Sequence, residues 1–237
     1  MYDVSKTVRE FALEVPQATR VFEKLGIDYC CGGGKTLSDA CDQAKIPVDE
    51  VLRRLSERGA QPAGDANWTQ ATLSDLIDHI VTRHHGYVKQ ELPRLEQLLN
   101  KVATKHGERH PELNEIKPIF ARLSDELTSH MMKEENILFP YIKQLEGSAT
   151  DSGRVRAPMF GTVRNPIHMM EIEHDSAGDC LAEMRELSSG YQAPEEGCFS
   201  YKTLYQALAD FELDLHQHIH LENNILFPRA IAIEAGQ

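Results

Sequence analysis

A duplicated run of residues carries the side chains with the clearest chemistry. The segment His130-Met-Met-Lys-Glu-Glu-Asn-Ile-Leu-Phe-Pro140 recurs without a gap as His218-Ile-His-Leu-Glu-Asn-Asn-Ile-Leu-Phe-Pro228. Each copy places a histidine four residues before a glutamate, and these glutamates are Glu134 and Glu222. Side chains four residues apart lie on one face of a helix, one turn from each other. Each pair can therefore converge on a single metal ion.

A further histidine precedes each copy at almost the same distance along the chain. It is His174 before the second copy, and either His84 or His85 before the first, because both fit the helical period. These histidines and glutamates fall on apolar stripes, so we expect them to point into a core. The stripes contain Ile77, Val81, Val88, Leu92 and Leu95; Leu123, Leu127, Ile137 and Tyr141; Ile167, Met170, Ala177, Leu181 and Met184; and Tyr201, Leu204, Leu208, Phe211, Leu215 and Ile225.

Metal binding is the interpretation that best accounts for charged residues on these stripes. A glutamate in an apolar seam is costly unless it meets a cation or strong hydrogen-bond donors. One inward histidine is usually a hydrogen-bonded core residue, but two repeated pairs favour a core with two metal ions. Nitrogen and oxygen donors without thiolate suit iron, with manganese and zinc as alternatives. His79, His168, His216 and His220 fall off the stripes, and we expect them at the surface or behind the ligands.

Four long helical patterns position these residues. They cover residues 72–105, 111–145, 165–189 and 200–234, and strand-like alternation is absent from the sequence. Loops rich in Gly, Ser and Pro are expected at 146–163 and 190–199. The sequence therefore predicts an all-α fold with an up-down-up-down four-helix bundle at 72–237.

A smaller helical domain is predicted at residues 1–60, joined to the bundle by a linker at 61–71. Short helices are expected at 8–13, 17–25, from Thr36, and at 48–58. Between them, the glycine-rich segment 28–34 should be an open loop that carries Cys30 and Cys31. These two thiols are either reactive groups or small apolar core residues, whereas Cys41, Cys180 and Cys198 have the settings of ordinary helix or loop residues.

The overall composition narrows the classes of partner. A net charge of −12 disfavours binding to nucleic acid or to anionic lipid. The sequence has no apolar run near the roughly 20 residues that a membrane span needs, and no secretory leader pattern. Its five cysteines lack the spacing of a disulfide framework. We therefore expect a cytoplasmic protein with free thiols.

The chain also resembles a known family through four motifs. They are DYCCGGG at 28–34, SHMMKEENILFP at 129–140, EIEHD at 171–175 and HIHLENNILFP at 218–228. Through them almost the whole chain is similar to the hemerythrin-like repair-of-iron-centres family (the YtfE, ScdA and DnrN types). The resemblance implies two iron ions with oxo and carboxylate bridges. It implies that the terminal ligands are His85, His130, His174 and His218, and that the bridges are Glu134 and Glu222.

The resemblance also bears on two points that spacing leaves open. It selects His85 over His84, because the family places its ligand at the end of the segment HIVTRHH, at 79–85. Oxygen-carrying hemerythrins are similar in outline, but they have a further histidine where this chain has Gly178. Their last motif is H-x-x-x-x-D, where this chain has H-x-x-x-E. We therefore expect a more open and reactive centre than a simple oxygen carrier has.

Members of this family are implicated in restoring iron-sulfur clusters after nitrosative or oxidative damage. By resemblance we expect iron donation to damaged iron-sulfur proteins, with nitric oxide or oxygen as small ligands. Cys30 and Cys31 would transfer iron or redox equivalents, one at a time or across a homodimer. Glu126 and Glu173 are either acidic steps for iron leaving the core or solvated surface acids. The alternatives are a di-iron enzyme that reduces nitric oxide or peroxide, and a sensor of oxygen, nitric oxide or iron.

Overall fold

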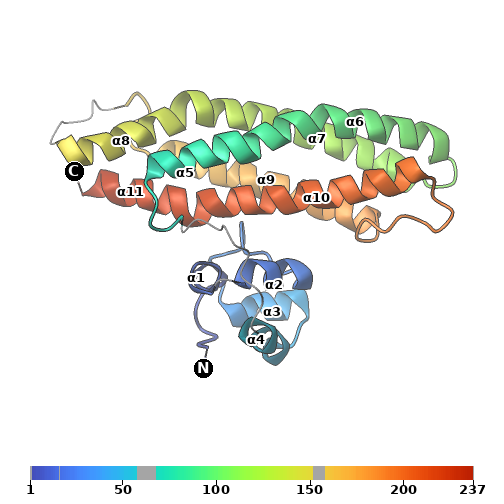
Figure 1. Ribbon diagram of the computed structural model, residues 1–237, viewed down its shortest axis with the longest axis horizontal. Helices are drawn as coiled ribbons and strands as arrows, with labels where there is room; N and C mark the ends of the chain where they lie inside the picture. The colour runs from blue at the N-terminus through green and yellow to red at the C-terminus, as the bar shows by residue number, and fades with distance from the viewer. Residues whose placement is uncertain (1, 16, 58–67, 152–157, 237) are drawn as a thin grey trace.

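Helices account for the fold throughout the described part of the chain. The computed structural model describes residues 2–15, 17–57, 68–151 and 158–236, and these contain helices and loops but no named strand. The long helices form rods that lie side by side in Figure 1, with a small helical domain against one side of them. The predicted all-α class with a four-helix bundle is therefore confirmed.

Three of the four rods contain a short π-helical segment, labelled η, between two α-helices. The first rod runs through α5 (Leu73–His79), η1 (Ile80–His85) and α6 (Gly86–His106). The second runs through α7 (Glu112–Lys133), η2 (Glu134–Leu138) and α8 (Phe139–Asp151). The third is α9 (Arg164–Leu187), and the fourth runs through α10 (Phe199–Leu221), η3 (Glu222–Leu226) and α11 (Phe227–Ala235).

Two apolar clusters fill the bundle, one on each side of a polar layer. The first cluster lies along α6, α7, α9 and α10 and includes Leu95, Phe120 and Phe211. The second lies along α5, α8, α11 and the start of α9, and includes Leu76 and Phe227. The predicted histidines and glutamates belong to neither cluster and lie between them along the rods. The apolar layers above and below therefore shield this polar layer from water.

Two glutamates hold the ends of the rods together in the same way. The carboxylate of Glu146 accepts hydrogen bonds from the backbone N–H groups of Leu73 and Ser74, at the start of α5. The carboxylate of Glu234 accepts from the N–H of Val163, just before α9. Free N–H groups at a helix start attract anions, so each glutamate fixes the start of a neighbouring rod. Glu146 belongs to α8, which continues to Asp151, so the loop predicted to begin at residue 146 begins later.

The N-terminal domain has its own core. It consists of α1 (Val8–Glu14), α2 (Ala18–Leu25), α3 (Leu37–Ala44) and α4 (Val48–Ser56), packed around buried Phe11, Phe22 and Leu55. The side chains of Thr36 and Thr72 cap α3 and α5 by accepting from the N–H of the third following residue, as the sequence indicates.

Most of the linker expected at 61–71 lies outside the described residues. At its end, the guanidinium of Arg229 donates to the backbone oxygens of Trp68 and Ala71.

Among the described residues, none of the helices combines the length and the apolar character that crossing a bilayer requires.

Candidate metal centre

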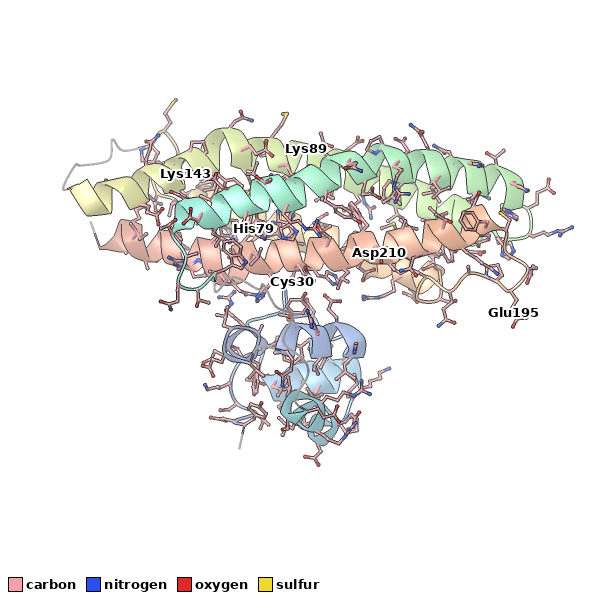
Figure 2. All side chains as sticks on the ribbon, viewed as in Figure 1. Cys30, His79, Lys89, Lys143, Glu195 and Asp210 are labelled. Carbon is pink, nitrogen blue, oxygen red and sulfur yellow. The ribbon has the colours of Figure 1, made fainter. Side chains whose placement is uncertain are left out.

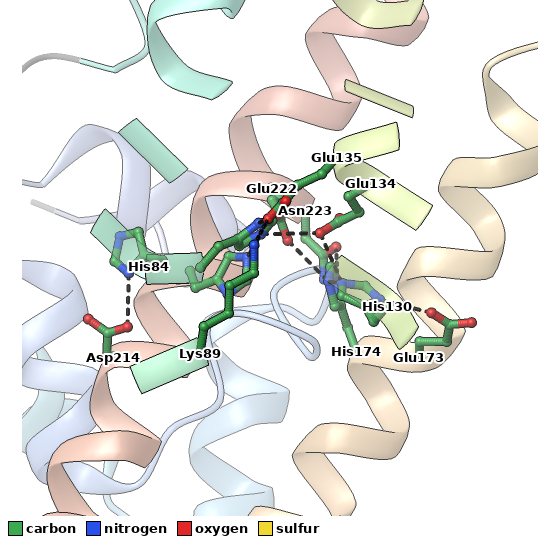
Figure 3. Close-up of polar contacts among 12 residues, drawn as sticks. His84, Lys89, His130, Glu134, Glu135, Glu173, His174, Asp214, Glu222 and Asn223 are labelled. Atoms are coloured by element: carbon green, nitrogen blue, oxygen red, sulfur yellow. Dashed lines mark hydrogen bonds and ion pairs between the residues drawn. The ribbon is translucent and has the colours of Figure 1, made fainter. Parts of the chain in front are cut away.

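The four rods bring six polar side chains to one level of the bundle, as Figure 3 shows from close by. The side chains form two groups with metal-ligand spacing, and both groups share the same two glutamates. All six are at most 2% exposed. The first group is His85, Glu134, His218 and Glu222, and the second is His130, Glu134, His174 and Glu222. The structure thus gathers every residue that the sequence and the resemblance select as a metal ligand.

Each group contains a close pair of imidazole nitrogens. The Nε2 atoms of His85 and His218 lie 3.1 Å apart, and the Nε2 atoms of His130 and His174 also lie 3.1 Å apart. Glu222 places its two oxygens 3.0 and 3.1 Å from the Nε2 of one histidine in each pair. The Oε2 of Glu134 lies 3.4 and 3.3 Å from the remaining two Nε2 atoms. Each glutamate therefore lies between the two groups, where a bridging ligand would lie.

The two glutamates test whether this layer suits metal ions. Both are fully buried, and both oxygens of Glu134 and the Oε2 of Glu222 lack a hydrogen bond. Burial of an ionised carboxylate without donors costs several kcal/mol, so some other positive partner must compensate. A cation between the carboxylate and the imidazoles provides that partner, and the mixed nitrogen and oxygen donors suit iron. The residues present therefore fit a pair of metal ions.

The neighbouring histidines already shift the pKa values of both carboxylates downward. Burial raises the pKa of Glu222, but two neighbouring imidazoles outweigh burial and hold this pKa well below its usual value. Burial and the charge of Glu222 raise the pKa of Glu134, yet its histidine neighbours bring the net shift below the usual value. Burial lowers the pKa of His130, whereas Glu134 and Glu173 raise it to about 10. Positive charge is thus favoured beside Glu134, whereas burial lowers the pKa of His218 beside Glu222.

The outward-facing Nδ1 atoms of three of these histidines have hydrogen-bond partners of their own. A partner on Nδ1 fixes the ring and leaves Nε2 free to bind a metal, an arrangement common among metal-ligating histidines. The Nδ1 of His218 has no hydrogen-bond partner in the described structure. The partners are Glu135 for His85 at 2.7 Å, Glu173 for His130 at 2.9 Å and Asn223 for His174 at 2.8 Å.

The π-helical segments place the glutamates and one of the histidines. Glu134 opens η2, Glu222 opens η3 and His85 closes η1. A proline ring clashes with the carbonyl four residues earlier in an α-helix, and Pro140 and Pro228 each follow a π-helical segment. The wider turn accommodates the proline and is a frequent feature of functional sites.

One residue was placed on the wrong face by the sequence pattern. Ile137, which the period of the second rod places in the core, is 51% exposed, and Leu138 is buried in its place. The extra residue in the η2 turn shifts the helical register there, and a constant period cannot anticipate this shift.

The remaining histidines lie around the centre without joining either group. His84 Nδ1 pairs with Asp214 at 3.1 Å, and its ring stacks on that of His218 with centroids 5.6 Å apart. His84 is thus buried beside a candidate ligand, in agreement with the choice of His85. His79 stacks on Trp68, and His168 is exposed at the surface.

His216 and His220 lie beneath the N-terminal domain. His216 Nδ1 contacts Glu23 of α2 at 3.0 Å. His220 is 8% exposed and shares a hydrogen bond of 2.7 Å with Asn224. The contact of His216 depends on how the two domains meet, whereas His220 and Asn224 lie one turn apart in the same rod.

The cysteine loop lies between the N-terminal domain and the bundle, where Figure 2 labels Cys30. The Asp28 carboxylate shapes the loop by accepting from the N–H groups of Cys30, Cys31 and Gly32. A Cβ at Gly33 would lie 2.9 Å from the backbone oxygen of Tyr29 and 3.3 Å from Asn224, so glycine permits the close approach there.

The two thiols are not equally exposed. Cys30 is 5% exposed, and Cys31 is partly buried. The Cys31 thiol, burial and Asp28 raise the pKa of Cys30 well above its usual value. A cavity of about 630 Å³ lies beside the loop and is lined by both cysteines, Asp175 and Asp179. The loop therefore adjoins an open space while Cys30 itself stays protonated.

Glu126 and Glu173 occupy different places. Glu173 accepts from His130 and forms an ion pair with Lys133, so it braces a candidate ligand. Glu126 accepts a hydrogen bond of 2.9 Å from Ser176 on α9, at the outer side of the bundle. Glu135, Asn223 and Asn224 were not among the residues predicted from the sequence. Their position directly after the repeated glutamates is the signal that could have identified them.

A four-helix bundle with two histidine pairs and two shared glutamates defines the class of hemerythrin-like metal-binding domains. Residues 76–230 match the family described as the hemerythrin HHE cation binding domain. Residues 4–58 match a family described as a domain of unknown function. The two matches cover the bundle and the N-terminal helices respectively.

Similar proteins narrow the class. The chain is 37% identical over 230 residues to the iron-sulfur cluster repair protein YtfE of Pectobacterium atrosepticum. It is 38% identical over 225 residues to the protein of the same name from Escherichia coli O81. Each comparison covers 95% of this chain and 96% of the relative. The chain therefore belongs to the family of YtfE iron-sulfur cluster repair proteins, and the resemblance inferred from its motifs is confirmed.

Proposed function

We propose that this protein binds two iron ions in the polar layer of its bundle and supplies iron to damaged iron-sulfur clusters in other proteins. The observation that carries this proposal is the pair of fully buried glutamates shared by two histidine pairs. Similar proteins along nearly the whole chain are named for iron-sulfur cluster repair. Bound iron would be both the cation that the buried carboxylates need and the cargo that is delivered.

The assignment of each residue follows from its position. His85 and His218 would hold one ion, His130 and His174 the other, and the two glutamates would bridge them. Six side chains leave coordination positions open, and we propose nitric oxide and oxygen as the small ligands of these positions.

Glu173 would keep His130 oriented, and its Lys133 partner would hold it in place. Glu126 remains a candidate for the path that iron follows out of the core.

The cysteines support a location in a reducing compartment and a role at the cavity beside the loop. All five are free, which agrees with a cytoplasmic location. Cys30 and Cys31 lie at the edge of the cavity beside α9, so we propose that they carry iron or redox equivalents between the centre and a client. A dimer that brings two such loops together remains a prediction, which the mass of the protein in solution would check.

The test is transfer of iron to a client in a defined mixture. Iron-loaded protein is mixed without oxygen with an iron-sulfur protein whose cluster nitric oxide has destroyed, together with sulfide and a thiol reductant. We expect the client to recover its cluster absorbance in proportion to the iron lost by the donor. Recovery equal to that with free iron alone would contradict donation, and catalytic consumption of nitric oxide with an electron donor would favour a reductase instead.

The cysteines are tested in the same mixture. We expect the double variant Cys30→Ala with Cys31→Ala to keep the iron content of the unmodified protein, because neither thiol belongs to the two metal groups. Its repair rate should fall. Cys198→Ala, on the loop before α10, is the matched control and should repair at the normal rate. An unchanged rate in the double variant would remove the pair from the mechanism.

A further inference from the structure

Asn223 joins a candidate metal ligand to the cysteine loop through a single amide group. Its Oδ1 lies 2.8 Å from the Nδ1 of His174, and its Nδ2 donates to the backbone oxygen of Cys30 at 3.3 Å. The side chain is 6% exposed, so water competes little for either contact. Figure 3 shows Asn223 beside His174. The oxygen of this planar amide thus contacts the bundle, and its nitrogen contacts the N-terminal domain.

The loop approaches the same helix at other points. The Cys31 thiol lies 3.5 Å from the backbone oxygen of His174. A Cβ built at Gly178 would lie 3.7 Å from the Cys31 sulfur, so a side chain much larger than a methyl group would collide with it. Asn224 also donates to the backbone oxygen of Tyr29 at 2.9 Å. The loop therefore covers α9 beside Gly178, the position at which oxygen-carrying hemerythrins have a further histidine.

The first copy of the repeat shows that this bridge is not a requirement of the metal layer. Glu135 stands at the place of Asn223, and it contacts the Nδ1 of His85 and the ammonium of Lys89 at the surface. Asn136 stands at the place of Asn224 and donates to Met132 within its own rod. Directly after the repeated glutamate, only the copy that the N-terminal domain covers has an amide, which can accept and donate together.

The contact between Asn223 and His174 also sets the orientation of the amide. A metal on Nε2 would fix the imidazole and leave a proton on Nδ1, which donates to Asn223 Oδ1 and so turns the NH₂ group toward Cys30. Loss of the metal would remove the bond that fixes the ring. The amide would then lose its fixed partner, and its hydrogen bond to Cys30 would weaken with it.

We propose that Asn223 couples metal binding at His174 to docking of the Cys30–Cys31 loop, so that the loop is held when metal is bound and released when metal leaves. This inference rests on the metal binding proposed above and adds a means of regulating that site. Coupling between two binding events is reciprocal, so docking of the loop also raises metal affinity. The thiols are then covered while iron is bound and accessible once the iron has been delivered.

The experiment measures alkylation of each cysteine in the full-length protein with and without bound metal. Zinc serves as the redox-inert probe, iodoacetamide as the reagent, and mass spectrometry resolves the sites. Removal of zinc should raise the modification rates of Cys30 and Cys31 about threefold or more, the factor expected from one buried hydrogen bond. Cys198 supplies a reference rate, and Cys41, fully buried in the N-terminal core, reports any unfolding of that domain.

Two variants separate the bridge from simple folding effects. Asn223→Asp keeps an acceptor for His174 but has no N–H for Cys30. It should therefore retain zinc and show fast alkylation in both states. Gly178→Leu should give the same fast alkylation by displacing Cys31, with Asn223 intact. The matched control Asn136→Asp lies on the exposed face and should behave as the unmodified protein does.

The outcomes distinguish this inference from the proposed function. Equal alkylation rates in zinc-bound and zinc-free protein would overturn the coupling and leave the metal centre untouched. Persistent protection by zinc in Asn223→Asp would also overturn it, because the thiols would then be shielded without the amide. Failure of the unmodified protein to bind metal would overturn both proposals together.

Discussion

The two halves of the bundle are alike inside and different outside. Glu134 and Glu222 open equivalent π-helical segments, and Glu146 and Glu234 stand at equivalent positions further on, where each fixes the start of a neighbouring rod. Directly after the first pair, the halves diverge. Glu135 faces a surface lysine, whereas Asn223 and Asn224 face the N-terminal domain. The shared residues build the polar layer with the candidate ligands, and the divergent ones decide what each half contacts.

The largest effect should come from the shared glutamates, where the halves are equivalent. Each glutamate belongs to both groups of candidate ligands, so its loss weakens both ions at once. We expect Glu134→Leu and Glu222→Leu to lower bound iron from two per chain to well below one, measured by elemental analysis of purified protein. A similar loss in both variants would support the equivalence.

A control variant separates loss of ligands from loss of folding. Glu96→Leu changes an exposed glutamate of α6 and should leave the iron content unchanged. Two irons retained in either bridging variant would show that the corresponding carboxylate is not a ligand.

An intermediate effect, on metal affinity, is expected at the position after the repeated glutamate, where one half has a charged residue and the other an amide. Glu135 braces His85 from the side opposite the metal layer, and residues that hold a ligating histidine typically contribute 10–100-fold to metal affinity. We therefore expect Glu135→Ala to weaken metal binding by about that factor in a competition titration with a chelator. Lys89→Ala removes only the exposed partner of Glu135 and should change affinity by less than about twofold. Equal affinities in Glu135→Ala and the unmodified protein would contradict this role.

The smallest expected effect is a loss of unfolding free energy, which we compare between variants of two asparagines. Asn224 is 4% exposed and binds Tyr29 and Arg9, so Asn224→Ala leaves buried groups unpaired and should cost about 1–3 kcal/mol. Asn136→Ala changes an exposed residue and should stay within about 0.5 kcal/mol. Urea unfolding curves compare the two. Similar losses of unfolding free energy would mean that the N-terminal domain does not depend on this contact.

Much of this arrangement follows from local regularities in the sequence. The rods and their apolar stripes repeat with the helical period, and Thr36 and Thr72 mark helix starts because their side chains cap the N–H groups that follow. The pairs His130 with Glu134 and His218 with Glu222 needed only the spacing of one turn. These features depend on residues close together in the chain, so the pattern alone could predict them.

Other features depend on contacts between distant segments. Spacing could not choose between His84 and His85, because η1 changes the register just where both stand, and Asp214 on another rod binds His84. The exposure of Ile137 has the same origin in η2. Nor could the sequence show that the loop covers Gly178, since that contact joins segments of two domains.

The amount of iron in freshly purified protein, made without chelator, tests the central claim most directly. We expect two irons per chain by elemental analysis, together with a near-ultraviolet and visible absorption that a zinc-loaded sample lacks. This result would explain why three of the four carboxylate oxygens of Glu134 and Glu222 are buried without a hydrogen bond, because two metal ions would be their partners. Protein that is free of metal yet fully folded and active in cluster repair would contradict the account.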